Sequence, residues 1–178
     1  MISAPPPRHG FTLIELMVTV AVIAVLAAIA APSLIQFIQS SRLSATANQF
    51  QGDLQFARRE AIKRNARVLV CPVSSTAGQC KTTTPFTAAD WAAGWYVCYD
   101  ADSNGQCDAT AANDPNPMVV RSALDATTQV TLTGPTLIVR FNADGSAAAA
   151  ATFTVALGAK SYAGSIALPG HIAMTKPS

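Results

Sequence analysis

The chain has 178 residues, of which 50% are hydrophobic and 12% are charged, and its formal net charge is +2 at neutral pH. This length predicts one domain plus whatever the N-terminus forms, and the small net charge excludes a global attraction to polyanions. The basic residues are concentrated locally, because five of the 12 lysines and arginines lie between Arg58 and Arg67.

The stretch from Phe11 to Ala31 is almost entirely apolar and contains one charged residue, Glu15. A helix of about 21 residues spans roughly 30 Å, the thickness of the hydrocarbon core of a bilayer. The stretch fits a secretory signal peptide, with Arg8 as its positive start and alanines at its end as a cleavage site, and it also fits a plain membrane anchor. Neither reading explains Glu15, because an ionised carboxylate inside a bilayer costs on the order of several kcal/mol.

A free amine would give Glu15 a partner. Cleavage after Gly10 would leave Phe11 with a new α-amino group, and helical side chains lean toward the N-terminus, so Glu15 would face that end. In a low dielectric the carboxylate and an ammonium group of its own chain or of a neighbouring subunit would neutralise each other.

The residues around this position also resemble a known signal. A short leader followed by GFTLIEL and an apolar helix resembles the class III signal of type IV pilins and pseudopilins. The resemblance implies that prepilin peptidase removes residues 1–10 and that Phe11 is N-methylated. It further implies that residues 11–32 form a transmembrane and filament-core helix, that Glu15 serves subunit docking, and that Pro32 kinks the helix, since proline removes a backbone hydrogen bond.

A second helical pattern follows over residues 33–65. Apolar residues recur at spacings of three and four, which places them on one face of an amphipathic helix that we expect to cover the core. This stripe consists of Leu43, Ala47, Phe50, Leu54, Ala57 and Ala61. Glu60 and Arg64 can pair one turn apart, and the helix is expected to end near Asn65.

The resemblance implies that residues 33–178 form a periplasmic globular domain. Beyond the helix, the sequence pattern of this domain predicts strands and turns. We expect strands at 67–73, 94–100, 117–122, 128–133, 136–142, 151–157 and 171–175, with turns rich in Gly, Pro, Asn and Asp between them. The pattern predicts an α+β fold in which a long helix packs on an antiparallel sheet. Trp91, Trp95 and Tyr96 form a local aromatic cluster that we interpret as core packing.

Four cysteines occur as two pairs, Cys71 with Cys80 and Cys98 with Cys107. An even number of cysteines beyond an apolar N-terminus favours an oxidising compartment, and the spacings do not match a zinc or thioredoxin motif. Three connectivities are possible; closure within each pair is preferred because short loops cost least to close, and free buried thiols remain the alternative.

Three further blocks carry a resemblance to a narrower family. QFQGDLQFARREAIKRNARVLVCP, DWAAGWYVCYDADSNGQCD and VRFNADGSA, in this order, are similar to the GspH/FimT family of minor pilins and pseudopilins. This implies a pilin-like fold and a subunit of a type IV pilus or of a type II secretion pseudopilus. Its expected partners are other pilins, prepilin peptidase, an inner-membrane assembly platform and the lipid bilayer.

The resemblance also implies a location and leaves alternatives. The chain is expected in the inner membrane with its globular domain in the periplasm, and the T-type resemblance and the cysteines favour the pilus over secretion. The alternatives are a DNA-binding minor pilin for natural transformation and a secreted soluble binding module released by ordinary signal cleavage.

The segment DADSNGQCD matches part of a calcium-binding loop. Asp100, Asp102, Asn104, Gly105 and Asp108 fall at positions 1, 3, 5, 6 and 9, but position 12 is alanine and no helices flank the loop. The competing interpretation is a plain hairpin loop rich in Asp, Asn and Gly.

The basic cluster is a weak candidate for phosphate contact with DNA. It consists of Arg58, Arg59, Lys63, Arg64 and Arg67, and three of these residues are predicted on one helical face: Arg59, Lys63 and Arg67. The alternative is a solvated or salt-bridging surface. DNA-binding members of the family resemble one another in a Gly-Arg-x-Arg element near the C-terminus, where this chain has Gly170, His171, Ile172 and Ala173.

Catalysis is not expected. Of the two histidines, His9 leaves with the predicted leader, and His171 alone is a thin basis for an oriented base beside a nucleophile. We expect no enzyme and no cofactor.

Overall fold

A computed structural model gives the fold and describes residues 11–108 and 115–175, with Pro32 described by its backbone alone. The chain forms two compact units, one ending at Ile38 and one covering Gln39–Ser178. The predicted leader and cleavage residue Gly10 lie outside the described residues. The backbone is helical through Pro32, and the kink expected there stays a prediction.

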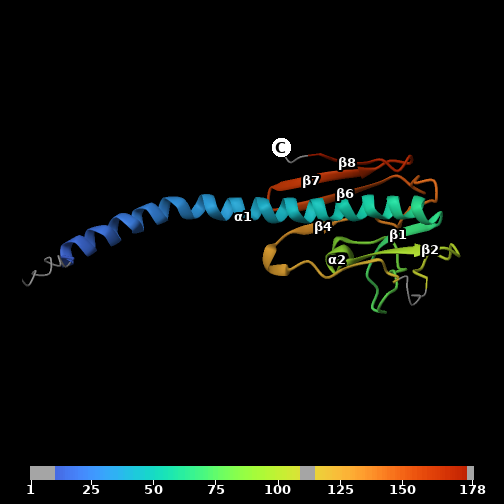
Figure 1. Ribbon diagram of the computed structural model, residues 1–178, viewed down its shortest axis with the longest axis horizontal. Coiled ribbons are helices and arrows are strands. Elements are labelled where there is room, and N and C mark those ends of the chain that lie inside the picture. Colours follow the sequence, from blue (N-terminus) through green and yellow to red (C-terminus); the bar gives the residue numbers. More distant parts are fainter. Residues whose placement is uncertain (1–10, 109–114, 176–178) are drawn as a thin grey trace, which may run out of the picture. The chain divides into compact units, whose positions relative to one another are not determined.

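The helix α1 (Leu13–Arg64) runs through the end of the first unit and into the second (Figure 1). It ends where the pattern predicts, because Asn65 adopts a left-handed conformation with φ 49°. The N–H of Asn65 donates to Ile62 O at 3.3 Å and the N–H of Ala66 donates to Ala61 O at 3.2 Å. These two bonds form a Schellman motif, which satisfies the last carbonyl groups and turns the chain into the first strand.

The described strands form two antiparallel sheets, where the pattern indicated one (Figure 1). The first sheet, in the order β3-β2-β1-β5, contains β1 (Arg67–Pro72), β2 (Trp95–Asp100), β3 (Val119–Arg121) and β5 (Val139–Phe141). The second sheet, in the order β4-β6-β7-β8, contains β4 (Thr131–Thr133), β6 (Ala151–Leu157), β7 (Lys160–Ile166) and β8 (Ile172–Thr175). A five-residue helix, α2 (Ala88–Ala92), and a 3₁₀ turn at Ala126–Thr128 lie in the connections.

The core of the second unit lies where α1 meets both sheets. All six residues of the predicted stripe are at most 1% exposed, which confirms the interpretation of this helix face. Phe50 stands at the centre, with its ring in edge contact with Trp91, Trp95 and Phe153 at centroid distances of 5.4, 5.3 and 5.0 Å. The two tryptophans are therefore core residues, as expected, and the α+β prediction of a long helix packed on antiparallel strands is confirmed.

Tyr96 does not join these tryptophans. Its side chain alternates to the other face of β2, where it packs with Leu69 and the cysteines in a second, smaller cluster. The two disulfides, Cys71–Cys80 and Cys98–Cys107, follow the predicted local pairing. They lie side by side, because the sulfur of Cys80 is 3.8 Å from that of Cys107.

Candidate functional site

The first turn of α1 holds the residues that the N-terminal signal singles out. The N–H of Glu15 donates to Thr12 Oγ1 at 3.3 Å, which is one half of a capping box in which threonine precedes glutamate by three residues. Glu15 therefore lies at the third helical position, where the helix dipole favours a negative charge. Phe11, which would carry the new amine, is 81% exposed just before this turn.

The helix beyond Glu15 presents apolar side chains on all sides. Large hydrophobic residues from Leu13 to Phe37 are more than half exposed in the chain alone, and none of the described residues from Phe11 to Ile38 is buried. The helix is long and apolar enough to cross a membrane. Such a surface requires lipid or neighbouring helices, because water around it is unfavourable.

The basic cluster is largely engaged within the chain. Arg64 Nε donates to Glu60 Oε2 at 2.9 Å, which confirms the predicted pair, and Lys63 Nζ donates to Glu60 Oε1 at 3.3 Å. Arg64 also lies over the ring of Tyr99, 5.2 Å from its centroid. Hydrogen bonding from Arg64, followed by that from Lys63, lowers the pKa of Glu60 against the opposing effect of its burial.

Arg67 does not share a helical face with the other basic residues, because α1 ends at Arg64 and Arg67 begins β1. It lies opposite Asp100 in the sheet, with Nη1 3.9 Å from Asp100 Oδ2. The prediction that Arg59, Lys63 and Arg67 form one helical face is therefore wrong. The physical reason is the left-handed conformation of Asn65, which ends the helix and turns the chain before Arg67.

Arg58 ties α1 to two turns of the second unit. Its Nε donates to Gly145 O at 2.9 Å and its Nη2 donates to Pro169 O at 3.2 Å. Gly170 is required beside it, since its φ is +79° and a Cβ there would lie 1.9 Å from Gly145 O. Arg58, the exposed Arg59 and His171 line a hollow of about 330 Å³. The structure thus gives Arg58 a tethering role and brings the helix next to the C-terminal turn.

The aspartate-rich loop begins at the end of β2. Asp100 is fully buried and its Oδ2 accepts the N–H of Gly105 at 3.1 Å. One carboxylate oxygen each of Asp100, Asp102 and Asp108 lies within 4.8 Å of the others. Burial raises the pKa of Asp100, and the neighbouring Asp102 adds to the rise, while the hydrogen bond from Gly105 opposes it. The loop thus brings the predicted calcium candidates together; Ala111 at position 12 lies outside the described residues.

The buried Asp53 and the partly exposed Arg121 form a polar pair that the sequence pattern did not reveal. Asp53 is 4% exposed and accepts two hydrogen bonds from Arg121, both at 2.8 Å, and one from Trp95 Nε1 at 2.9 Å. The hydrogen bond with Asp53 raises the pKa of Arg121. An aspartate on the apolar side of an otherwise amphipathic helix was the available signal, but its partner is 68 residues away in sequence.

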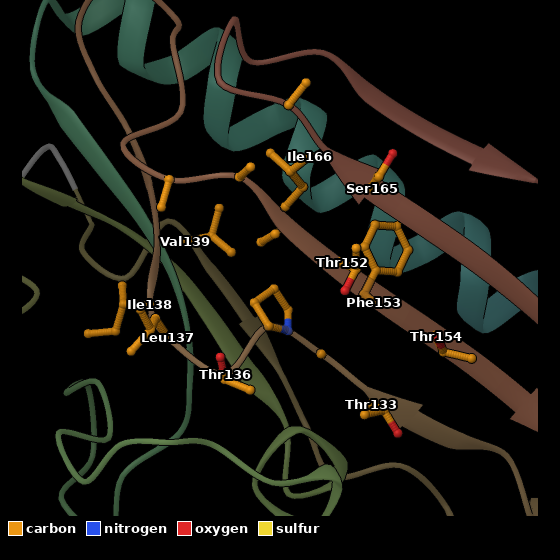
Figure 2. A pocket seen from close by; sticks show the side chains of 16 residues that line it. Thr133, Thr136, Leu137, Ile138, Val139, Thr152, Phe153, Thr154, Ser165 and Ile166 are labelled. Carbon is orange, nitrogen blue, oxygen red and sulfur yellow. The ribbon is translucent and has the colours of Figure 1, made fainter.

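A cavity of about 660 Å³ lies between the two sheets, beside the connection from β4 to β5 (Figure 2). Its walls come from the segment Thr133–Val139 and from β6 and β7 (Figure 2). The lining is apolar apart from threonine and serine hydroxyl groups. Such a lining suits contact with apolar groups, and its described residues include no charged side chain.

An exposed apolar helix that continues into the core of an α+β domain defines the class of pilin-like proteins. A family model described as "Type II transport protein GspH" matches residues 46–169, and one described as "Prokaryotic N-terminal methylation motif" matches residues 6–31. The chain therefore belongs to the GspH family and carries the methylation motif of pilins and pseudopilins, as its resemblance implied.

Solved structures share the fold. A crystal structure of the type IV minor pilin FimU of Pseudomonas aeruginosa superposes with a TM-score of 0.57 at 18% identity, covering 80% of this chain and 96% of that one. A second crystal form of FimU gives a TM-score of 0.53 at 16% identity, covering 76% and 96%. No curated protein sequence matches the chain.

Proposed function

We propose that the chain is a filament subunit, a minor pilin or pseudopilin that acts in assembly rather than in turnover. The observation that carries this proposal is the methylation motif at the start of an exposed apolar helix, in a chain of the GspH family. Before assembly, the helix anchors the subunit in the inner membrane with the globular domain in the periplasm. During assembly, its apolar surface moves from lipid to neighbouring helices, so the transfer costs little hydrophobic free energy.

Processing at Gly10 creates the partner that Glu15 needs. Glu15 is the one charged residue between the leader and Arg42. Prepilin peptidase would free the amine of Phe11, four residues before Glu15, and the same amine on a neighbouring subunit would accept the carboxylate as its counter-ion. A pair of this kind is favourable where water is excluded, whereas either charge alone is costly. It fixes the axial register of one subunit against the next.

Mass spectrometry of the mature N-terminus tests the processing. We expect the first residue of the membrane-bound protein to be N-methylated Phe11, and we expect Gly10→Val to leave the leader attached while Gln55→Ala is processed normally. A mature chain that begins at Pro32 or Ser33 would instead show ordinary signal cleavage and a soluble product, and would contradict the proposal.

Fractionation distinguishes the two filament types. A pilus subunit is expected in the fibres sheared from the cell surface, whereas a pseudopilin is expected to stay with the cell envelope. Both outcomes fit a filament subunit, and each selects one of the two systems.

A further inference from the structure

The loop from Asp100 to Asp108 follows β2 and takes no part in the proposed filament role. Its residues occupy positions 1, 3, 5, 6 and 9 of a calcium loop, and the structure reproduces the turn on which such a loop depends. Gly105, at position 6, has φ +84°, and its N–H donates to Asp100 Oδ2. This bond directs the carboxylate of position 1 into the loop.

A buried oxygen in this loop lacks a partner. Among the residues that the structure describes, Asp100 Oδ1 has no hydrogen bond, although the side chain of Asp100 is 0% exposed. An unsatisfied buried polar atom costs free energy and is uncommon in native proteins. Because Oδ2 is held by Gly105, Oδ1 remains available for a cation.

The internal hydrogen bonds of the loop do not remove this need. Asp102 Oδ1 accepts the N–H of Asn104 at 3.1 Å, and Asp108 Oδ2 accepts the N–H of Ala101 at 2.8 Å. These bonds order the turn, as they would in a plain Asp- and Asn-rich hairpin. They leave Asp100 Oδ1 unsatisfied and keep carboxylate oxygens of three aspartates within 4.8 Å of one another.

The charges of the loop are also incompletely balanced. In the described part of the chain, the recorded ion pair of these aspartates is the one between Asp100 and Arg67, whose atoms are 3.9 Å apart. Arg140 also lies beside the loop, since its Nη2 would be 3.4 Å from a Cβ at Gly105. Three carboxylates therefore face two guanidinium groups, and a divalent cation would relieve the repulsion that remains.

The loop is held in shape by a covalent bond. The disulfide Cys98–Cys107 starts in β2 and closes just before Asp108, with a Cα–Cα distance of 5.4 Å. The ends of the segment are therefore fixed before any ligand binds, which reduces the ordering cost of binding.

We propose that this loop is a calcium site, with oxygen ligands from Asp100, Asp102, Asn104 and Asp108. Water completes the coordination, because position 12 offers no carboxylate. The donor set of carboxylate and amide oxygens on an irregular loop suits Ca²⁺, which accepts variable geometry, better than Mg²⁺, which demands a near-ideal octahedron.

Calorimetry on the full-length oxidised protein in detergent tests this site. After removal of metals with EDTA and desalting, titration with calcium chloride is expected to give saturable heat with a dissociation constant on the order of 10⁻⁴ to 10⁻³ M. Magnesium chloride is expected to bind at least about tenfold more weakly. Calcium should also raise the melting temperature, because it binds the folded state alone.

Variants assign the binding to the loop. Asp102→Asn, at an exposed position, is expected to weaken calcium binding about tenfold or more while keeping the melting temperature measured in EDTA, and Asp108→Asn serves as a second variant. Asp144→Asn changes an aspartate in a different turn and should bind like the wild type. The proposal is overturned if about 10 mM calcium gives neither saturable heat nor a shift in melting temperature, or if both loop variants bind as the wild type does.

Discussion

At the scale of single residues, Asp53 is a buried polar group within the core. It lies on the helix face that packs on the sheets, and three hydrogen bonds from Arg121 and Trp95 satisfy its carboxylate. The pair is partly accessible, since the side chain of Arg121 is 37% exposed. It fixes α1 against β2 and β3.

We therefore expect Asp53→Ala to lower the free energy of unfolding by about 3 kcal/mol, because it leaves the indole N–H and the guanidinium group without their acceptor. Urea unfolding of the full chain in detergent, followed by tryptophan fluorescence, measures this loss. The control is Lys63→Ala, which removes an exposed ion pair and should cost less than about 1 kcal/mol. Equal effects of the two substitutions would show that Asp53 is not a structural anchor.

At the scale of elements, the short helix α2 relies on a charged cap. Asp90 accepts hydrogen bonds from the backbone N–H and the hydroxyl of Thr87, at 2.8 and 2.9 Å, and pairs with Lys81. The bond from Lys81, followed by that from the backbone of Thr87, lowers the pKa of Asp90 from 3.8 to about 2. The cap holds the short helix that carries the buried Trp91.

Acid should loosen this element. The unfolded chain binds a proton at Asp90 more tightly than the folded chain, so the stabilisation is complete above pH 3.8 and is lost as the pH falls to about 2. We expect the urea midpoint to fall across this range, and to fall less in Asp90→Asn, which has no proton to gain. Glu60, whose pKa is also lowered, acts in the same direction in both proteins. Identical pH profiles for the two proteins would contradict the role of Asp90.

The elements also show what the sequence pattern can and cannot predict. The α1 stripe and seven strand regions were predictable, because periodicity reports which face is buried. Strand β7 was not, since its sequence KSYAGSI has few β-forming residues. Gly164 has a reason to stand in this strand: it pairs with Phe153 on β6, and a Cβ there would lie 2.1 Å from Phe153 Cζ. The glycine makes room for the ring, a cross-strand relation that no local pattern contains.

The candidate sites likewise divide into those that the sequence predicts and those that only the fold reveals. GFTLIEL and the aspartate loop are contiguous in sequence, so their residue types and spacing could be read directly. The partners of Asp53 and the tethering contacts of Arg58 join residues 42 to 111 positions apart, and only the fold brings them together. The division of the strands into two sheets is equally non-local.

At the scale of the whole molecule, the two units differ in how far they expose their apolar side chains. The described part of the unit ending at Ile38 exposes its large apolar residues, whereas the unit from Gln39 onward buries most of its described large apolar residues in a core between α1 and two sheets. The second unit has a core of its own, so the exposed helix is available to another environment. In the proposed filament that environment is first lipid and then other subunits, with Glu15 providing the register.

Incorporation of a Glu15→Ala subunit into filaments measures this account most directly. The matched control is Thr19→Ala, one turn further along α1, where the hydroxyl donates only to Leu16 O within the helix. We expect Glu15→Ala to be made and inserted in the membrane but strongly depleted from purified filaments, and Thr19→Ala to be incorporated normally. Incorporation of Glu15→Ala at the wild-type level would contradict the pairing of this carboxylate with a subunit amine.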